Sequence, residues 1–148
     1  MAGGRGMTGP THHPTDPTRP PLPFEYAVLR AVPRVDRGER VNVGVVVYCQ
    51  GADYLGAAAH VDPDRLRLLD PRVDVDAVRA ALDGICAVCE GSPDAGRAAE
   101  GPIRARFGQL TAPRSTVVQP GPVHGGLTGD PAAELERLLT RLVRVRGE

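Results

Sequence analysis

The sequence contains no lysine and no tryptophan, and its aromatic residues are limited to three tyrosines and two phenylalanines. Without lysine the chain cannot form a Walker phosphate loop, and the absence of a Gly-x-Ser-x-Gly segment gives no support to a serine hydrolase. The scarcity of aromatic residues argues against a single-stranded nucleic-acid binder, because such proteins usually stack bases on several rings. No apolar run reaches the ~18 residues of a membrane span, so we expect no membrane insertion.

Cysteine is also scarce, and the three cysteines do not form a recognisable metal or disulfide pattern. Cys86 and Cys89 have redox-like spacing but fall in the middle of a predicted helix, where we expect them to be small buried apolar residues. Zinc would need further ligands, and Cys49, His60 and His124 lack metal-site spacing. We therefore expect no metal and no cofactor. With no apolar leader at the N-terminus, the expected location is the cytoplasm.

All of the basic residues are arginines, and their 18 positive charges balance 18 acidic ones to a net charge of zero. A duplex nucleic-acid binder normally shows an excess of basic charge, which argues against that class. Ala, Gly, Pro and Arg are enriched together, as a GC-rich coding sequence would produce. A chain of 148 residues is typical of one domain. The Gly-, Pro- and Thr-rich segment 1–22 predicts a disordered tail, which leaves 23–148 as the single domain.

Three segments with strand character follow the tail. Phe24–Val32 alternates between two faces, Val41–Cys49 is apolar on both faces, and Tyr54–Val61 is a weaker strand. Their short connections predict an antiparallel meander, to which Thr116–Val118 could add a fourth strand. Gly44 is unfavourable inside a strand and therefore predicts a bulge or the close approach of another backbone.

The apolar residues change to helical spacing after the third strand. The pattern predicts one or two helical turns over Pro63–Leu69. A longer helix is expected to begin after Asp74 or Asp76 and to continue to Cys89.

The last third of the chain carries one strong helix signal. Asp130 followed by proline predicts the N-cap and first turn of a final amphipathic helix. The segment 103–110 is compatible with more than one structure, and the glycine- and proline-rich segment 119–129 predicts a loop. The fold class is therefore α+β, with helices packed on one face of a small antiparallel sheet.

Arginines crowd the connection between the first two strands, which we call the arginine hairpin (residues 30–42), and recur between residues 103 and 116. If the two groups meet, they would form an arginine-lined cleft suited to a carboxylate, a phosphate or an acidic peptide. The alternative is a solvated hairpin tip with local ion pairs that contribute little. The candidate ligand-binding residues are Arg30, Arg37, Glu39, Asn42 and Arg114.

Three function classes remain open at this point. The first is a small accessory or binding module that acts through protein contact or an anionic ligand at the arginine hairpin. The second is an enzyme acting on a phosphate-containing substrate, for which the sequence shows no convergent acid or base beyond Glu39, Asn42 and Arg114. The third is a single-stranded nucleic-acid binder.

Several blocks of the sequence match a known family pattern. They are Phe24-x-Tyr26-Ala27-Val28-x-Arg30-x-Val32-Pro33, Arg37-Gly38-Glu39-x-x-Asn42-Val43-Gly44-Val45-Val46, Leu68-Leu69-Asp70-Pro71, Phe107-Gly108, Ala112-Pro113-Arg114 and Asp130-Pro131-x-x-Glu134-Leu135-x-x-Leu138. From about Phe24 to the C-terminus the chain resembles the bacterial domain of unknown function 3037 family. The resemblance implies no activity and no catalytic residue. It implies a HipA-like kinase as a partner, because genes of that family often lie beside genes for such kinases.

Overall fold

The computed structural model describes residues 20–144. Most of the segment 1–22, predicted to be a disordered tail, thus lies outside the described residues, and Leu22 already begins the first strand. Within residues 20–144 no helix combines the length and the apolar character that crossing a membrane requires.

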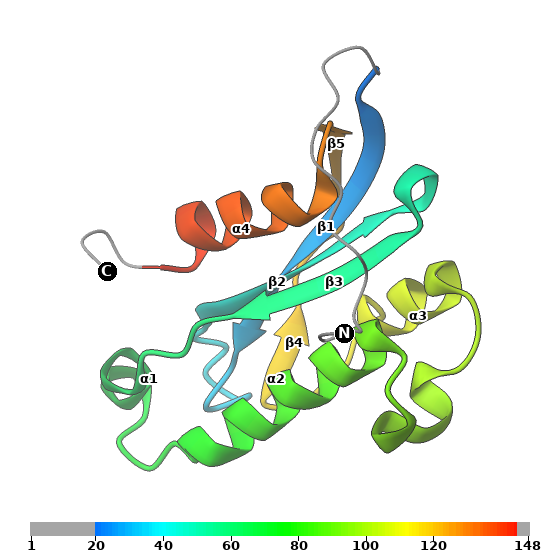
Figure 1. Ribbon diagram of the computed structural model, residues 1–148. Coiled ribbons are helices and arrows are strands. Elements are labelled where there is room, and N and C mark those ends of the chain that lie inside the picture. Colours follow the sequence, from blue (N-terminus) through cyan, green and yellow to red (C-terminus); the bar gives the residue numbers. More distant parts are fainter. Residues whose placement is uncertain (1–19, 145–148) are drawn as a thin grey trace.

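Five strands and four α-helices make up this part of the chain (Figure 1). The strands are β1 (Leu22–Ala31), β2 (Val41–Cys49), β3 (Tyr54–Ala59), β4 (Val118–Pro120) and β5 (His124–Thr128). The helices are α1 (Pro63–Leu69), α2 (Val75–Glu90), α3 (Ile103–Leu110) and α4 (Pro131–Leu142), with short 3-10 segments η1 (Gln50–Ala52) and η2 (Pro93–Ala99). The α+β class is confirmed.

All strand pairs of the sheet are antiparallel, in the order β3-β2-β1-β4, and β5 also pairs with β1. The meander of the first three strands is therefore confirmed. β4 is the additional strand, but it shares only Val118 with the predicted segment Thr116–Val118 and continues into the segment 119–129, for which the sequence predicts a loop. β1 is long enough for β4 and β5 to lie one after the other along the same edge. β4 pairs with residues 29–31 of β1, and β5 pairs with residues 22–26.

The strand β5 occupies a segment for which the sequence predicts a loop. Its residue Gly126 is paired with Phe24, and a Cβ atom at Gly126 would lie only 2.8 Å from Cε1 of the Phe24 ring. The aromatic ring of β1 thus occupies the space where a β5 side chain would project. Because β1 supplies the apolar groups here, β5 lacks the alternation of polar and apolar residues by which a strand is identified in a sequence.

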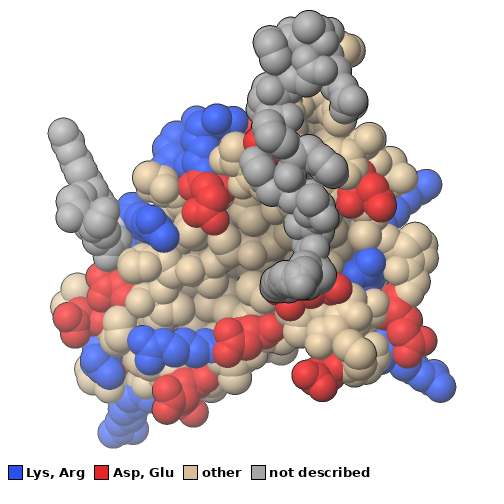
Figure 2. All heavy atoms as spheres, in the orientation of Figure 1, with Lys and Arg blue, Asp and Glu red and all other residues tan. Residues whose placement is uncertain are grey.

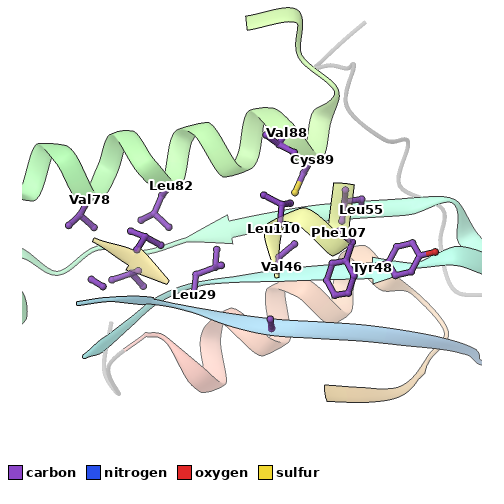
Figure 3. Close-up of a cluster of buried hydrophobic side chains, with 14 of the residues drawn as sticks. Leu29, Val46, Tyr48, Leu55, Val78, Leu82, Val88, Cys89, Phe107 and Leu110 are labelled. Atoms are coloured by element: carbon purple, nitrogen blue, oxygen red, sulfur yellow. The ribbon is translucent and has the colours of Figure 1, made fainter. Parts of the chain in front are cut away.

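Hydrophobic clusters lie on both faces of the sheet. On one face Leu29 and Val46 pack against α2 and α3, through residues such as Leu82 and Phe107 (Figure 3). The rings of Tyr48 and Phe107 stack there, with centroids 5.1 Å apart. On the other face the side chains of Phe24, Val45, Val47 and Cys49 pack against those of Leu135, Leu138, Leu139 and Val143 from α4 and the residue that follows it.

This second cluster differs from the expected arrangement of all helices on one face. α4 covers the face opposite α2 and α3, over β2 and β3 (Figure 1). The physical reason is the strand β2, in which every residue from Val43 to Cys49 is buried. A strand that is apolar on both faces needs cover on both, and a single helical layer would leave Val45 and Val47 in water.

A β-bulge interrupts the pairing of β1 with β2. Leu29 is paired with Gly44 and Arg30 with Asn42, so Val43 is the extra residue of β2. Gly44 also lies against another backbone, because a Cβ atom there would be 2.8 Å from the Ala58 carbonyl oxygen of β3. The bulge changes the face on which the side chain just before the extra residue lies, as bulges commonly do. It places Asn42 beside Arg30 on the α4 face.

Candidate anion-binding site

Two of the predicted site residues pair with each other at the tip of the arginine hairpin. Nε of Arg37 lies 2.6 Å from a carboxylate oxygen of Glu39, and both side chains are about half exposed. Beside them Arg34 pairs with Asp36 at 2.8 Å, and this hydrogen bond lowers the pKa of the Asp36 carboxyl. These exposed pairs contribute little to stability. Glu39 is therefore engaged by Arg37 and not by Arg30.

Three other arginines bind carbonyl groups at the C-terminal ends of helices. Arg114 donates to the Gln109 carbonyl at the end of α3. Arg106 donates to the carbonyls of Val88 and Cys89, which end α2, and Arg65 donates to Val143 just after α4. A cation at this position satisfies unpaired carbonyls and is attracted by the negative end of the helix dipole. Their visible role is structural.

Asn42 also caps the C-terminal end of α4. Its Nδ2 donates to the Leu142 carbonyl oxygen at 3.0 Å, so the side chain fastens the helix to the bulged end of β2. Together with Arg65, Asn42 satisfies the two carbonyls that α4 presents at its end, Leu142 and Val143. Arg30 lies next to Asn42 in the register but is not needed for this capping.

Arg30 stands on the α4 face of β1, since its neighbours Leu29 and Ala31 both belong to the cluster on the other face. Its strand partner on β4 is Gln119, but its guanidinium lies over Gly121, two residues further along. A Cβ atom at Gly121 would be 2.9 Å from Cζ of Arg30. The absence of a side chain at Gly121 therefore creates the space in which the guanidinium lies.

Within residues 20–144, Arg30 is the one arginine that is partly buried and has no side-chain partner. The other arginines without a hydrogen bond or ion pair through the side chain are all exposed: Arg72, Arg97, Arg104, Arg141 and Arg144. A guanidinium that loses part of its hydration without gaining a partner is unfavourable. Of the five predicted site residues, Arg30 is thus the one whose structure suggests a ligand.

The residues beside Arg30 on this face form what we call the β1 strip: Tyr26, Val28, Arg30, Gly121 and His124. Tyr26 and Val28 follow the same alternation as Arg30 and, like it, are partly buried, whereas His124 is exposed. His124 is the strand partner of Tyr26, and the centroids of their rings are 5.3 Å apart. α4 packs on β2 and β3, so the strip lies beside the helix rather than beneath it.

The sequence indicated only part of this strip. The period-two alternation of β1 already places Tyr26 and Arg30 on one face. Gly121 and His124 could not be anticipated, because their segment was expected to be a loop. Conversely, Arg114 is directed to the end of α3, whose Phe107 packs on the opposite face of the sheet. The contacts of the structure do not bring the five predicted residues together.

The cysteines have the environment of structural residues. Cys89 is buried in the cluster beneath α2, and burial strongly raises the pKa of its thiol. Burial also raises the pKa of Cys86, whose sulfur approaches the Ala57 carbonyl oxygen at 3.8 Å. Reactive thiols have a lowered pKa, so neither cysteine has the character of a nucleophile. The described part of the chain contains no group of three or more potential metal ligands.

Charges are well mixed on the face of the molecule that Figure 2 shows. Basic and acidic side chains alternate around its rim and do not gather into one large basic patch. This agrees with the zero net charge of the chain. A partly buried arginine without a partner among residues 20–144, rather than a broad positive field on this face, is therefore the feature that marks this protein.

Comparison with known proteins places the chain in a family. The family described as protein of unknown function (DUF3037) matches residues 26–143, which include all five strands and four helices apart from the first residues of β1. The chain belongs to this family, as the sequence blocks indicated. No curated protein and no solved structure matches it.

Proposed function

We propose that this protein is a small binding module that holds an anionic ligand, a phosphate or a carboxylate, at Arg30. The observation that supports the proposal is the partly buried guanidinium, which lies over Gly121 and has no partner among the described residues. An anion would complete its hydrogen bonds and offset its desolvation, and guanidinium groups suit such oxygens because they bind them bidentately. The backbone of Gly121 lies beneath the guanidinium, and Asn42 is the strand partner of Arg30 on the other side, on β2.

A binding role is favoured over an enzymatic one because the two carboxylates of the hairpin, Asp36 and Glu39, are both engaged in ion pairs. General acid or base catalysis requires a titratable group close to the bound substrate. Glu39 is instead paired with Arg37 at the exposed tip. Arg37, Glu39 and Arg114 would contribute to the ligand only if their present contacts were exchanged.

The test is a titration of the full chain with inorganic phosphate, followed by NMR shifts of the backbone amides around Gly121. We expect saturable shifts in the native protein and a loss of affinity of roughly tenfold or more in Arg30→Gln. A charged hydrogen bond is worth about 1.5–3 kcal/mol. Because the guanidinium makes no bond within residues 20–144, the variant should keep the stability of the native chain.

Arg97→Gln is the matched control, since Arg97 is exposed and its side chain makes no hydrogen bond or ion pair within residues 20–144. It should bind phosphate as the native protein does. Equal affinity in Arg30→Gln and Arg97→Gln would refute the site. A large loss of stability in Arg30→Gln would show instead that Arg30 has a structural role.

A protein partner is the second candidate, and we place its contact at β5. Among residues 20–144 this strand pairs with β1 alone, and the apolar side chains of Leu127 within it and of Val123 just before it are exposed. The family resemblance implies a HipA-like kinase as this partner, acting in the cytoplasm. Co-purification of such a kinase with the native chain, and its loss in Leu127→Ser, is the expected result. Retention of the kinase by Leu127→Ser would remove β5 as the contact.

A further inference from the structure

We infer that the anion bound at Arg30 is the phosphate of a mononucleotide, whose base stacks on the Tyr26–His124 ring pair. This inference rests on the proposed anion site and adds the second chemical feature of its ligand. It follows from two observations that are independent of each other: the direction in which the Arg30 side chain extends, and the accessible rings at the neighbouring position of the same face.

The Arg30 side chain extends back along β1 toward Tyr26. Its guanidinium lies over Gly121, and the backbone N–H of Gly121 donates to the Val28 carbonyl at 2.8 Å. The charged group of Arg30 is therefore found beside Val28, two residues nearer to Tyr26 than its own Cα. Residues two apart on a strand are separated by about 6.6 Å, which makes the guanidinium and the ring of Tyr26 near neighbours on this face.

The ring pair offers an accessible platform at that position. Tyr26 is partly buried and His124 is exposed, and the planes of their rings are inclined by 34°. Behind them Phe24 stacks on Tyr26 with centroids 5.9 Å apart, and that ring is buried in the α4 cluster. Tyr26 is thus held in place by Phe24 and is still partly exposed. Stacking of a base on such a ring is favourable whichever base it is.

A nucleotide places a planar ring and a phosphate one sugar apart, which fits a ring platform and a guanidinium that are neighbours on the same face of the sheet. A simple carboxylate or inorganic phosphate would use Arg30 and leave the rings bare. A nucleic-acid strand would need a row of further cations, because every phosphate along it carries a charge. The β1 strip provides one guanidinium, and the net charge of the chain is zero. A single free nucleotide is therefore the ligand that the charges favour.

Gly121 gives a direct test of the guanidinium position. Ala in its place would put a Cβ atom 2.9 Å from the Arg30 guanidinium, which is the free end of a flexible side chain and can move aside. Gly121→Ala should therefore displace Arg30 without unfolding the sheet. Gly125→Ala is the matched control, since its Cβ atom would meet only the Phe24 carbonyl oxygen at an ordinary 3.6 Å.

The experiment titrates the full chain by calorimetry with inorganic phosphate, AMP, UMP and a single-stranded oligonucleotide of about 10 nucleotides. We expect both nucleotides to bind roughly tenfold or more tightly than phosphate, because base stacking adds to the phosphate contact. His124→Ala should lower nucleotide affinity toward that of phosphate and leave phosphate affinity unchanged. Gly121→Ala should weaken both ligands, and Gly125→Ala neither.

The outcomes separate this inference from the proposed function. If AMP and UMP bind no more tightly than phosphate, or if His124→Ala has no effect, the base platform is refuted while the anion site stands. If neither phosphate nor nucleotide binds, both fail together. If the oligonucleotide binds much more tightly than UMP and with a steep salt dependence, the site follows a strand and the assignment to a single nucleotide is overturned.

Discussion

Replacing Gly44 with valine is expected to destabilise the protein by about 1–3 kcal/mol, toward the upper end of that range. Gly44 lies at the bulge in the centre of the sheet, where β1, β3 and α2 all approach the position that a Cβ atom would occupy. A Cβ atom at Gly44 would lie 2.8 Å from the Ala58 carbonyl oxygen, 3.3 Å from Cδ1 of Leu29 and 3.5 Å from Cδ2 of Leu82. The first of these is a backbone atom of β3, so it cannot move without disturbing the β2–β3 pairing.

The measurement is chemical denaturation of the native chain and two glycine variants. Gly84→Ala is the control, because Gly84 lies on the exposed side of α2 and a Cβ atom there would meet nothing within 4 Å. Alanine in a helix should raise the free energy of unfolding by roughly 0.5–1 kcal/mol. A Gly44→Val protein as stable as the native one would mean that β2 does not lie where the structure places it.

The strands and helices with strong local signals could be read from the sequence. β2 begins and ends where the apolar run predicts, and α4 starts after Asp130, whose carboxylate accepts from the Ala133 amide as an N-cap. α2 is capped in the same way by Asp74, one of the two residues considered. These features depend on residues close together in the chain, so pattern and capping rules suffice to find them.

The second helical layer also left a trace in the sequence. Val45, Val47 and Cys49 form an apolar face of their own, separate from that of Val46 and Tyr48. Such a strand demands cover on both faces, and the amphipathic helix at the C-terminus is available to provide it. A single layer of helices, as the sequence analysis expects, cannot cover both apolar faces of β2.

The candidate site was less accessible to sequence reasoning because its parts meet only through strand pairing. Gly121 and His124 approach β1 through the register of β4 and β5, which no local pattern reports. For the arginines the limit is a different one, because charge and spacing in the sequence cannot distinguish a ligand-binding arginine from one that caps a helix. The structure makes the distinction: the guanidinium groups of Arg106 and Arg114 bind carbonyls of helices, whereas that of Arg30 has no partner within residues 20–144.

Among the arginines that bind helix ends, Arg106 is the one whose removal we expect to lower the stability most. Its Nη1 donates to the carbonyls of Val88 at 2.8 Å and Cys89 at 3.2 Å, and its Nε donates to Gly101 at 3.2 Å. The side chain thereby ties α3 to the end of α2 and to the loop between them. Removing a charged donor from partly buried carbonyls typically costs about 1.5–3 kcal/mol, so we expect Arg106→Ala to lose about 2–3 kcal/mol of unfolding free energy.

Arg104→Ala provides the comparison, because Arg104 lies two residues earlier on the same helix, is exposed, and makes no side-chain hydrogen bond or ion pair within residues 20–144. Its loss should change the unfolding free energy by less than about 0.5 kcal/mol, as for most surface substitutions. Arg106→Lys should recover only part of the stability, since one ammonium cannot reproduce the geometry of the guanidinium. If Arg104→Ala and Arg106→Ala were equally stable, arginines would not be holding these helix ends. The high arginine content would then need another explanation, such as a ligand. A large difference in stability between the two variants would instead show that arginines such as Arg106 serve the fold, which leaves Arg30 for binding.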